Sequence, residues 1–149
     1  MVVLKRLSDD PYQCGTEVKD VHRYTIVLRT SREKIEKVVG QIEKLIDVLK
    51  AFVHEDDEVV HQEIALYKIK TTELKSINVE QVVRENSAKI LTVDPDFIVI
   101  EKTGYKQETQ ALLDKLKPFG ILEFARSGRV AVSKSMKELS TYLKELEIN

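Results

Sequence analysis

The most informative residues for chemistry lie in the segment ARSGRV, residues 125–130, where two arginines flank a serine and a glycine. Glycine permits the backbone of a turn or β-bulge, and each guanidinium group can pair with a carboxylate. The alternative interpretation is that the glycine only bends a long strand and that the arginines are solvated. Four residues are therefore candidate contacts to a partner: Arg126, Ser127, Gly128 and Arg129.

A second candidate contact is the pair His22 and Arg23, at the start of an expected strand, where such residues either cap an exposed strand end or touch a partner. The segment HEDDEVVHQE, residues 54–63, contains carboxylates and two histidines, which are residue types that bind metal ions. It lacks the glycine of a calcium-binding loop, so we interpret it as a solvated linker and expect no metal site.

The single cysteine, Cys14, cannot form an internal disulfide, and no motif places a base near it. We interpret it as a bystander and expect no catalytic residue in the chain. The net charge of −1 gives no electrostatic reason to expect binding to nucleic acid or an anionic membrane. The sequence shows neither a charged leader followed by an apolar run nor about twenty consecutive apolar residues, so we expect a cytoplasmic protein.

Apolar residues in the first half predict a strand, a helix and a second strand. Polar and apolar side chains alternate over residues 23–29, and residues 47–54 form a short β-prone run. Between them, apolar residues recur at the spacing of one helix face. This face consists of Ile35, Val38, Val39, Ile42, Leu45 and Ile46.

The second half repeats this series, with a strand at 96–103, a helix through Leu112 and Leu116, and a strand at 121–134. Corresponding positions lie 72 residues apart at Ile26 and Ile98, so the two halves are interpreted as a duplicated unit. A strand at 62–70, a helix near 78–88 and a strand at 89–93 precede the second series. The order β-α-β-β-α-β predicts an α+β, ferredoxin-like fold.

Helices cover only one face of such a sheet, yet the expected strands are apolar on both faces. Phe97 and Val99 alternate with Ile98 and Ile100. A sheet with one solvated face would alternate apolar and polar residues, so we expect the second face to be covered by another domain or another chain. The sequence therefore predicts an oligomer, and a homodimer is the simplest form.

From about Asp20 to Lys134 the chain resembles the small regulatory subunit of acetolactate synthase (acetohydroxyacid synthase), which has two tandem ACT-type domains. The segments that carry the resemblance are VHRYTIV, VGQIEKLIDVLKAF, HQEIALYKIK and TGYKQETQALLDKLKPFGILEFARSGRVAVSK, in this order. The resemblance implies four parts. These are a poorly matched segment (1–19), a partial ACT domain lacking its leading strand and helix (20–58), a second ACT-like domain (59–134) and an amphipathic helix (135–149).

The resemblance implies a regulator and not a catalyst. Members of the family pair with a large catalytic subunit, which uses thiamine diphosphate and Mg²⁺ to join two 2-keto acids in branched-chain amino-acid biosynthesis. The small subunit stimulates this reaction and confers feedback inhibition, typically by valine. The family binds its effector largely through the loop after the first strand, which we expect this chain to lack, so no effector-binding residue is assigned. No cofactor is expected in this chain.

Other functions fit the residues less well. An acylphosphatase-like enzyme would need a Gly-rich phosphate-binding loop, and an RNA-recognition module would need aromatic-rich strands, but aromatic residues make up only 6% of the chain. A free-standing amino-acid sensor or adaptor of the ACT type stays open as the alternative. It would bind an amino acid without a catalytic partner, whereas a regulatory subunit would stimulate one.

Overall fold

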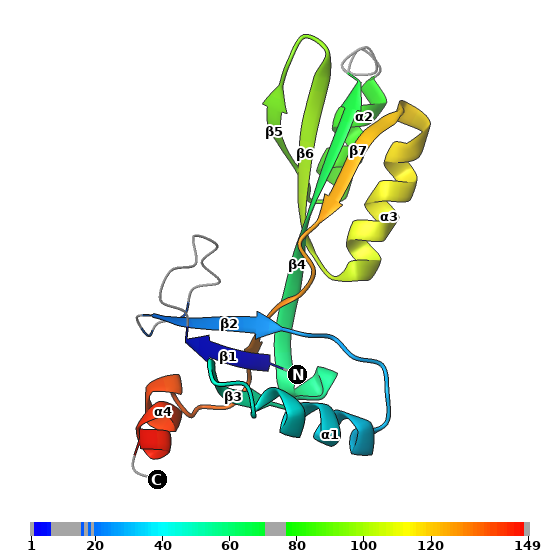
Figure 1. Ribbon diagram of the computed structural model, residues 1–149. Helices are drawn as coiled ribbons and strands as arrows, with labels where there is room; N and C mark the ends of the chain where they lie inside the picture. The colour runs from blue at the N-terminus through cyan, green and yellow to red at the C-terminus, as the bar shows by residue number, and fades with distance from the viewer. Residues whose placement is uncertain (1, 7–15, 17, 19, 71–76, 148–149) are drawn as a thin grey trace. The chain divides into compact units, whose positions relative to one another are not determined.

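The computed structural model describes the chain except for residues 1, 7–15, 17, 19, 71–76 and 148–149 (Figure 1). It divides into two compact units. The first unit is Met1–Val60 together with Ala131–Asn149, and the second unit is His61–Val130. None of the helices in the described part of the chain has the length and apolar character that a membrane-spanning helix needs.

The second unit contains the complete β-α-β-β-α-β pattern. Its elements are β4 (Val59–Lys70), α2 (Ile77–Glu85), β5 (Lys89–Val93), β6 (Phe97–Gly104), α3 (Lys106–Leu116), the short 3₁₀ helix η3 (Lys117–Phe119) and β7 (Ile121–Arg126). The strands lie in the order β5-β6-β4-β7, and each neighbouring pair is antiparallel. This is the ferredoxin-like arrangement, and the expected α+β class is confirmed.

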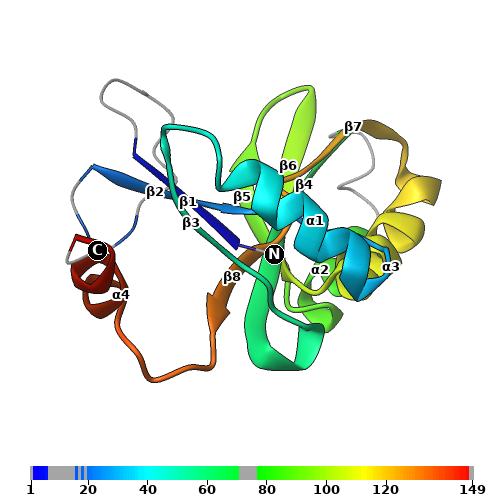
Figure 2. The same ribbon diagram turned by 60° about the horizontal axis from the view of Figure 1, so that its bottom comes forward.

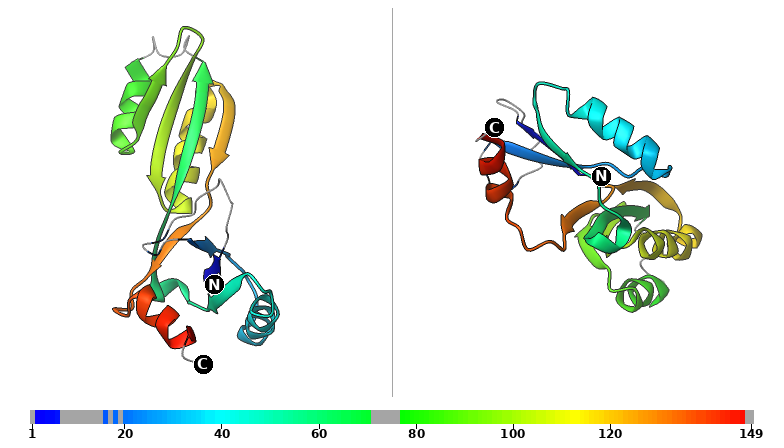
Figure 3. Two further views of the ribbon diagram at one scale, coloured as in Figure 1. Left: turned by 60° about the vertical axis from the view of Figure 1, so that its left-hand side comes forward. Right: turned by 90° about the horizontal axis from the view of Figure 1, so that it is seen from below.

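Both helices of the second unit pack on the same face of its sheet (Figure 3, left). Alternate residues of β4 are buried there because successive side chains of a strand point to opposite faces. The core lies between this face and the two helices. It consists of Ala65, Tyr67, Ile69, Val79, Val83, Ile98, Ile100, Leu112 and Leu116.

The first unit has a smaller sheet in the order β2-β1-β3. Its elements are β1 (Val2–Arg6), β2 (Val21–Thr25), α1 (Arg32–Ile42), β3 (Val48–Phe52), the 3₁₀ helix η1 (Asp56–Glu58) and α4 (Leu139–Glu147). A further strand, β8 (Val130–Ser133), pairs with β4. In this unit α1 connects two parallel strands, and β1 runs antiparallel between them.

β1 corrects one expectation about the first unit. The leading strand was expected to be absent, but Val2–Arg6 occupies the central position that β4 holds in the second unit. The reason is that β2 and β3 each present an inner edge with unpaired backbone groups, and a short β-prone run satisfies both. Residues 7–20 connect β1 to β2, whereas the corresponding connection between β4 and β6 is longer and spans residues 71–96. The described residues of the shorter connection include no helix.

The amphipathic helix expected at the carboxyl end is α4, and it packs within the first unit (Figure 2). Leu139 forms a small buried cluster with Val21 of β2, and Leu143 of α4 and the half-buried Phe52 of β3 pack against this cluster. Met136 precedes the helix and is fully exposed. α4 therefore supplies an apolar cover to one face of the small sheet.

Candidate functional site

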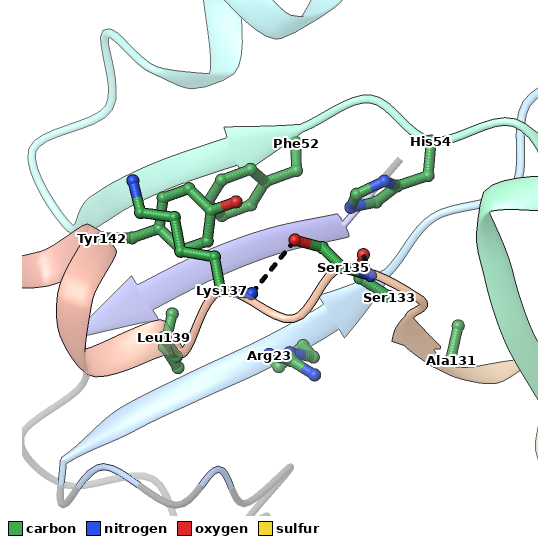
Figure 4. Close-up of a pocket in the computed structure, with 9 residues that line it drawn as sticks. All are labelled: Arg23, Phe52, His54, Ala131, Ser133, Ser135, Lys137, Leu139 and Tyr142. Atoms are coloured by element: carbon green, nitrogen blue, oxygen red, sulfur yellow. Dashed lines mark hydrogen bonds between the residues drawn. The ribbon is translucent and has the colours of Figure 1, made fainter.

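A pocket in the first unit lies between β2, β3 and the segment that leads into α4 (Figure 4). Its volume is about 60 Å³. A single water molecule needs roughly 10–15 Å³ on this scale, so the cavity has room for a small organic molecule. Its lining residues are Arg23, Phe52, His54, Ala131, Ser133, Ser135, Lys137, Leu139 and Tyr142.

Arg23, one of the residues that the sequence pointed to, lines this pocket. Its Nε atom is buried and has no hydrogen-bond partner among the residues that the structure describes. The neighbouring His22 is buried, and its Nδ1 atom likewise lacks a partner within the described chain. A buried donor that is left unsatisfied costs free energy, which a bound acceptor would recover.

His54 forms part of the pocket wall and stacks on Phe52, with 6.2 Å between the ring centroids. Burial lowers the pKa of His54, while the nearby Glu58 carboxylate opposes this change and the charge of Arg23 adds to it. The imidazole is therefore neutral at physiological pH. It adds a polar surface to the pocket but no positive charge.

The second cation of the pocket, Lys137, is already paired. Its Nζ atom lies 2.6 Å from Oε2 of Glu145 and 4.0 Å from the ring centroid of Tyr142. Two serine hydroxyls complete the polar side: Ser133 Oγ accepts the backbone N–H of Ser135, and Ser135 Oγ accepts that of Lys137. Each hydroxyl keeps its own hydrogen as a donor.

A second candidate site is the face of the large sheet opposite its helices. It holds a hollow of about 240 Å³ lined by Leu66, Lys68, Phe97, Val99, Glu123 and Ala125. Leu66 is 37% exposed and the neighbouring Ile64 is 43% exposed, both large for aliphatic side chains in mid-strand. The expected second apolar face is therefore present, and no described residue of the second unit's own helices covers it.

The ARSGRV segment splits into residues with different roles. Arg126 is engaged within its own unit: its Nε lies 3.0 Å from Oε1 of Glu63, and its Nη2 donates to Oε1 of Gln110 at 3.1 Å. The guanidinium also lies over the ring of Phe124, 5.2 Å from the centroid. The side chain of Arg126 is 19% exposed, and its role as a contact to a partner stays a prediction.

The remaining residues of ARSGRV form a turn after β7. Gly128 has φ of +76°, in the left-handed region that glycine adopts at little cost. Two hydrogen bonds join Ser127 to Ile64 of β4: its N–H donates to Ile64 O, and its Oγ accepts from Ile64 N. Within the turn, the same Oγ donates to Gly128 O. Arg129, half-buried, follows this turn. The turn thus continues the pairing of β7 with β4 beyond Arg126.

The sequence analysis did not predict the buried polar cluster beside Arg126, which consists of Glu63, Thr109 and Tyr67. The Thr109 hydroxyl donates a short hydrogen bond to Oε1 of Glu63, and the Tyr67 hydroxyl donates to the backbone O of Thr109 at 2.6 Å. Burial raises the pKa of Tyr67 to about 12, so the phenol stays protonated. The available signal was Glu63, the acidic residue on the buried face of the alternating strand β4.

The segment HEDDEVVHQE, expected as a solvated linker, contains η1 and the start of β4. His54 and Glu58 approach to 3.9 Å. No group of three or more His, Cys, Asp or Glu residues in the described ranges is placed to hold a metal ion. Cys14 lies outside the described residues.

Comparison with known proteins places these features in a family. Residues 62–135 match the family model described as the small subunit of acetolactate synthase. The acetolactate synthase small subunit of Mycobacterium bovis is 35% identical over 127 residues, which cover 85% of this chain and 76% of the relative. That of Bacillus subtilis is 31% identical over 134 residues, covering 89% and 78%. The crystal structure of the small subunit from Thermotoga maritima superposes with a TM-score of 0.77 at 23% identity, over 91% of this chain and 96% of that one.

Proposed function

Because the chain belongs to the acetolactate synthase small-subunit family, we propose that it binds the catalytic subunit of this enzyme and stimulates acetolactate formation. The observation that carries the proposal is the family match across both units. The family name supports a regulatory role, and stimulation of the catalytic subunit is the specific form of regulation that we propose. The thiamine diphosphate and Mg²⁺ implied by the family resemblance belong, in this proposal, to the catalytic subunit.

The proposed assembly is a homodimer, with the open face of the large sheet as the contact between copies. Lys68 and Glu123, directly opposite each other on β4 and β7, place both signs of charge beside an apolar centre formed by Leu66, Val99 and Ala125. In a two-fold contact the same patch meets itself, so it must complement its own charges. A patch with both signs beside an apolar centre meets this requirement, which favours a second copy as the occupant.

The proposed dimer gives regulation a physical route. A ligand that binds one arrangement of the complex more tightly than another shifts the populations by the difference in binding free energy. Feedback inhibition by valine, which the family resemblance implies, would act in this way. Whether this chain confers it is the second arm of the experiment.

The decisive experiment measures acetolactate formation by the catalytic subunit of the same organism while the chain is titrated, with and without valine. We expect the rate to rise with the chain and to saturate at a fixed ratio. Stimulation that valine reverses would extend the proposal to feedback inhibition. Stimulation that valine leaves unchanged would restrict it to activation. An unchanged rate at every ratio would contradict the proposal and favour a free-standing sensor or adaptor.

The dimer contact is tested with Leu66→Lys, which adds a charge to the centre of the open face. We expect light scattering to show the mass of a monomer at micromolar concentration, with an unchanged thermal melt of the second unit, because Leu66 lies outside its core. The matched control is Leu45→Lys, at an exposed position outside both sheets. A wild-type chain that is already monomeric, or a Leu66→Lys variant that stays dimeric, would refute the contact.

A further inference from the structure

The pocket of the first unit carries one positive charge that nothing described in the chain neutralises. Its cationic lining residues are Arg23 and Lys137, and the ammonium of Lys137 is paired with Glu145. Arg23 retains a buried Nε without an acceptor among the described residues. The guanidinium is planar and matches a carboxylate with two parallel hydrogen bonds, so an anion of this geometry would supply an acceptor for Nε.

The other walls of the pocket favour a ligand with a small apolar body. Phe52, Leu139 and Tyr142 present apolar surface, and Ala131 leaves space beside them. The hydroxyls of Ser133 and Ser135 lie on the polar side, and each has a hydrogen to donate to an anionic or carbonyl oxygen. Small-molecule sites commonly have such a composition, with mostly apolar walls and a few polar groups that fix orientation.

The lining residues that the structure describes offer only neutral acceptors to the ammonium group of an amino acid. None of the nine lining residues in the described part of the chain is an aspartate or glutamate, and the acceptors include the hydroxyls of Ser133 and Ser135 and the imidazole of His54. Burying an α-ammonium group beside Arg23 would place two positive charges together with only one carboxylate to offset them, whereas a monoanion neutralises the charge of Arg23. The charge distribution therefore disfavours an amino acid and favours its analogue without the amino group.

We propose that this pocket binds a small monocarboxylate with an apolar body and no ammonium group, and that Arg23 pairs with its carboxylate. The ligand class includes short branched 2-oxo acids and simple aliphatic acids. The described lining residues all belong to the first unit, so binding can be measured on this chain without the catalytic subunit. Direct binding to the full chain thus separates this proposal from the proposed stimulation.

The test uses isothermal titration calorimetry on the full-length chain with three probes. The first two, 3-methyl-2-oxobutanoate and valine, differ only in the oxo or amino group at one carbon, and inorganic phosphate serves as an anion without an apolar body. We expect saturable binding of the oxo acid and at least about tenfold weaker binding of both other probes. Valine binding as tight as the oxo acid would overturn the exclusion of the ammonium group. Phosphate binding as tight would overturn the apolar selection.

Variants of Arg23 then test whether its guanidinium group binds the carboxylate of the oxo acid. Arg23→Gln should weaken binding of the oxo acid at least about tenfold, because the charged, two-pronged contact is lost. The matched control is Arg29→Gln, an exposed arginine outside the pocket, which should bind within about twofold of wild type. Circular dichroism checks that each variant is folded. If Arg23→Gln does not fold, Arg23→Lys keeps the charge without the planar fork and should still bind measurably weaker. Absence of binding by wild type, or equal binding by a folded Arg23 variant, would overturn the proposal.

Discussion

Both units contain a strand-helix-strand series, β2-α1-β3 in the first and β6-α3-β7 in the second, but they bury its helix to different extents. In the second unit α3 buries Thr109, Leu112 and Leu116 against a sheet with a twelve-residue central strand. In the first unit α1 has the stronger segregation of apolar and polar faces in its sequence, yet none of its residues is fully buried. Its sheet has five-residue strands and relies on α4 for a buried contact. The comparison teaches that helical periodicity identifies an apolar face, whereas burial depends on the sheet available to receive it.

The largest predicted loss of stability comes from a substitution in the core of the second unit. Leu112→Ala should lower the free energy of unfolding by about 2–5 kcal/mol, because the leucine is fully buried and its removal leaves a cavity between α3 and the sheet. The measurement is urea-induced unfolding followed by circular dichroism. A loss below about 1 kcal/mol would show that the helix adjusts its packing and that the core is less rigid than the structure indicates.

The matched control lies in the first unit, just after α1. Leu45→Ala makes the same substitution at a side chain that is 59% exposed. We expect a change within about 0.5 kcal/mol, as for most surface substitutions. Equal losses from both variants would mean that the segment after α1 is covered in solution, and the contrast between the two units would fail.

The next prediction compares the stability lost when a buried ion pair is removed with the stability lost when an exposed ion pair is removed. Arg126→Ala should cost about 2 kcal/mol of stability, because it leaves the Glu63 carboxylate, which is 4% exposed, without its cation. Arg32→Ala, which removes a pair with Glu36 between two well-exposed side chains in the first unit, should change stability by less than about 0.5 kcal/mol. Thermal melts of both variants provide the measurement.

The Arg126 variant also separates two roles for the ARSGRV segment. A structural role predicts lower stability, with any loss of acetolactate stimulation following the loss of folded protein. If Arg126→Ala instead kept its melting temperature but no longer stimulated the catalytic subunit, the guanidinium would be a partner contact. That outcome would contradict the intramolecular pairing with Glu63 as the main role of this residue.

Much of the fold was predictable from local patterns. The alternation of β4 and the helical spacing of α3 depend on residues close in sequence, and the α+β class followed from their order. The end of α1 was not predictable in this way. Leu45 and Ile46 continue the helical spacing, but the helix ends at Ile42 and Ile46 is fully exposed. A turn follows the helix and leads directly into β3. In this turn the N–H of Leu45 donates to the carbonyl of Ile42, and the carbonyl of Leu45 accepts the N–H of Val48.

The sites were less predictable than the fold, since they join residues far apart in sequence. Arg126 meets Glu63 across the β4–β7 pairing, and Thr109 reaches the same carboxylate from α3. The pocket at Arg23 needs the segment from Ala131 to Tyr142 to fold back onto β2 and β3. No spacing rule encodes such a return, because it depends on which sheet face remains uncovered after the strands have paired.

The smallest predicted effect concerns Glu43, which follows α1 in the first unit. A hydrogen bond and ion pair with Lys50, at 2.8 Å, lowers the pKa of Glu43, and the carboxylate also accepts the N–H of Ala51 at 3.2 Å. A lowered folded-state pKa means that the stabilisation is complete above the ordinary value near 4.5 and is lost as pH falls through the folded-state value. Both side chains are about a third exposed, so Glu43→Gln should cost less than about 1 kcal/mol at neutral pH. In urea unfolding the difference from wild type should shrink as the pH falls below 4.5 and vanish at a pH low enough to protonate the carboxylate in the folded state as well. A difference that persists at this pH would assign the effect to packing of the side chain and not to its charge.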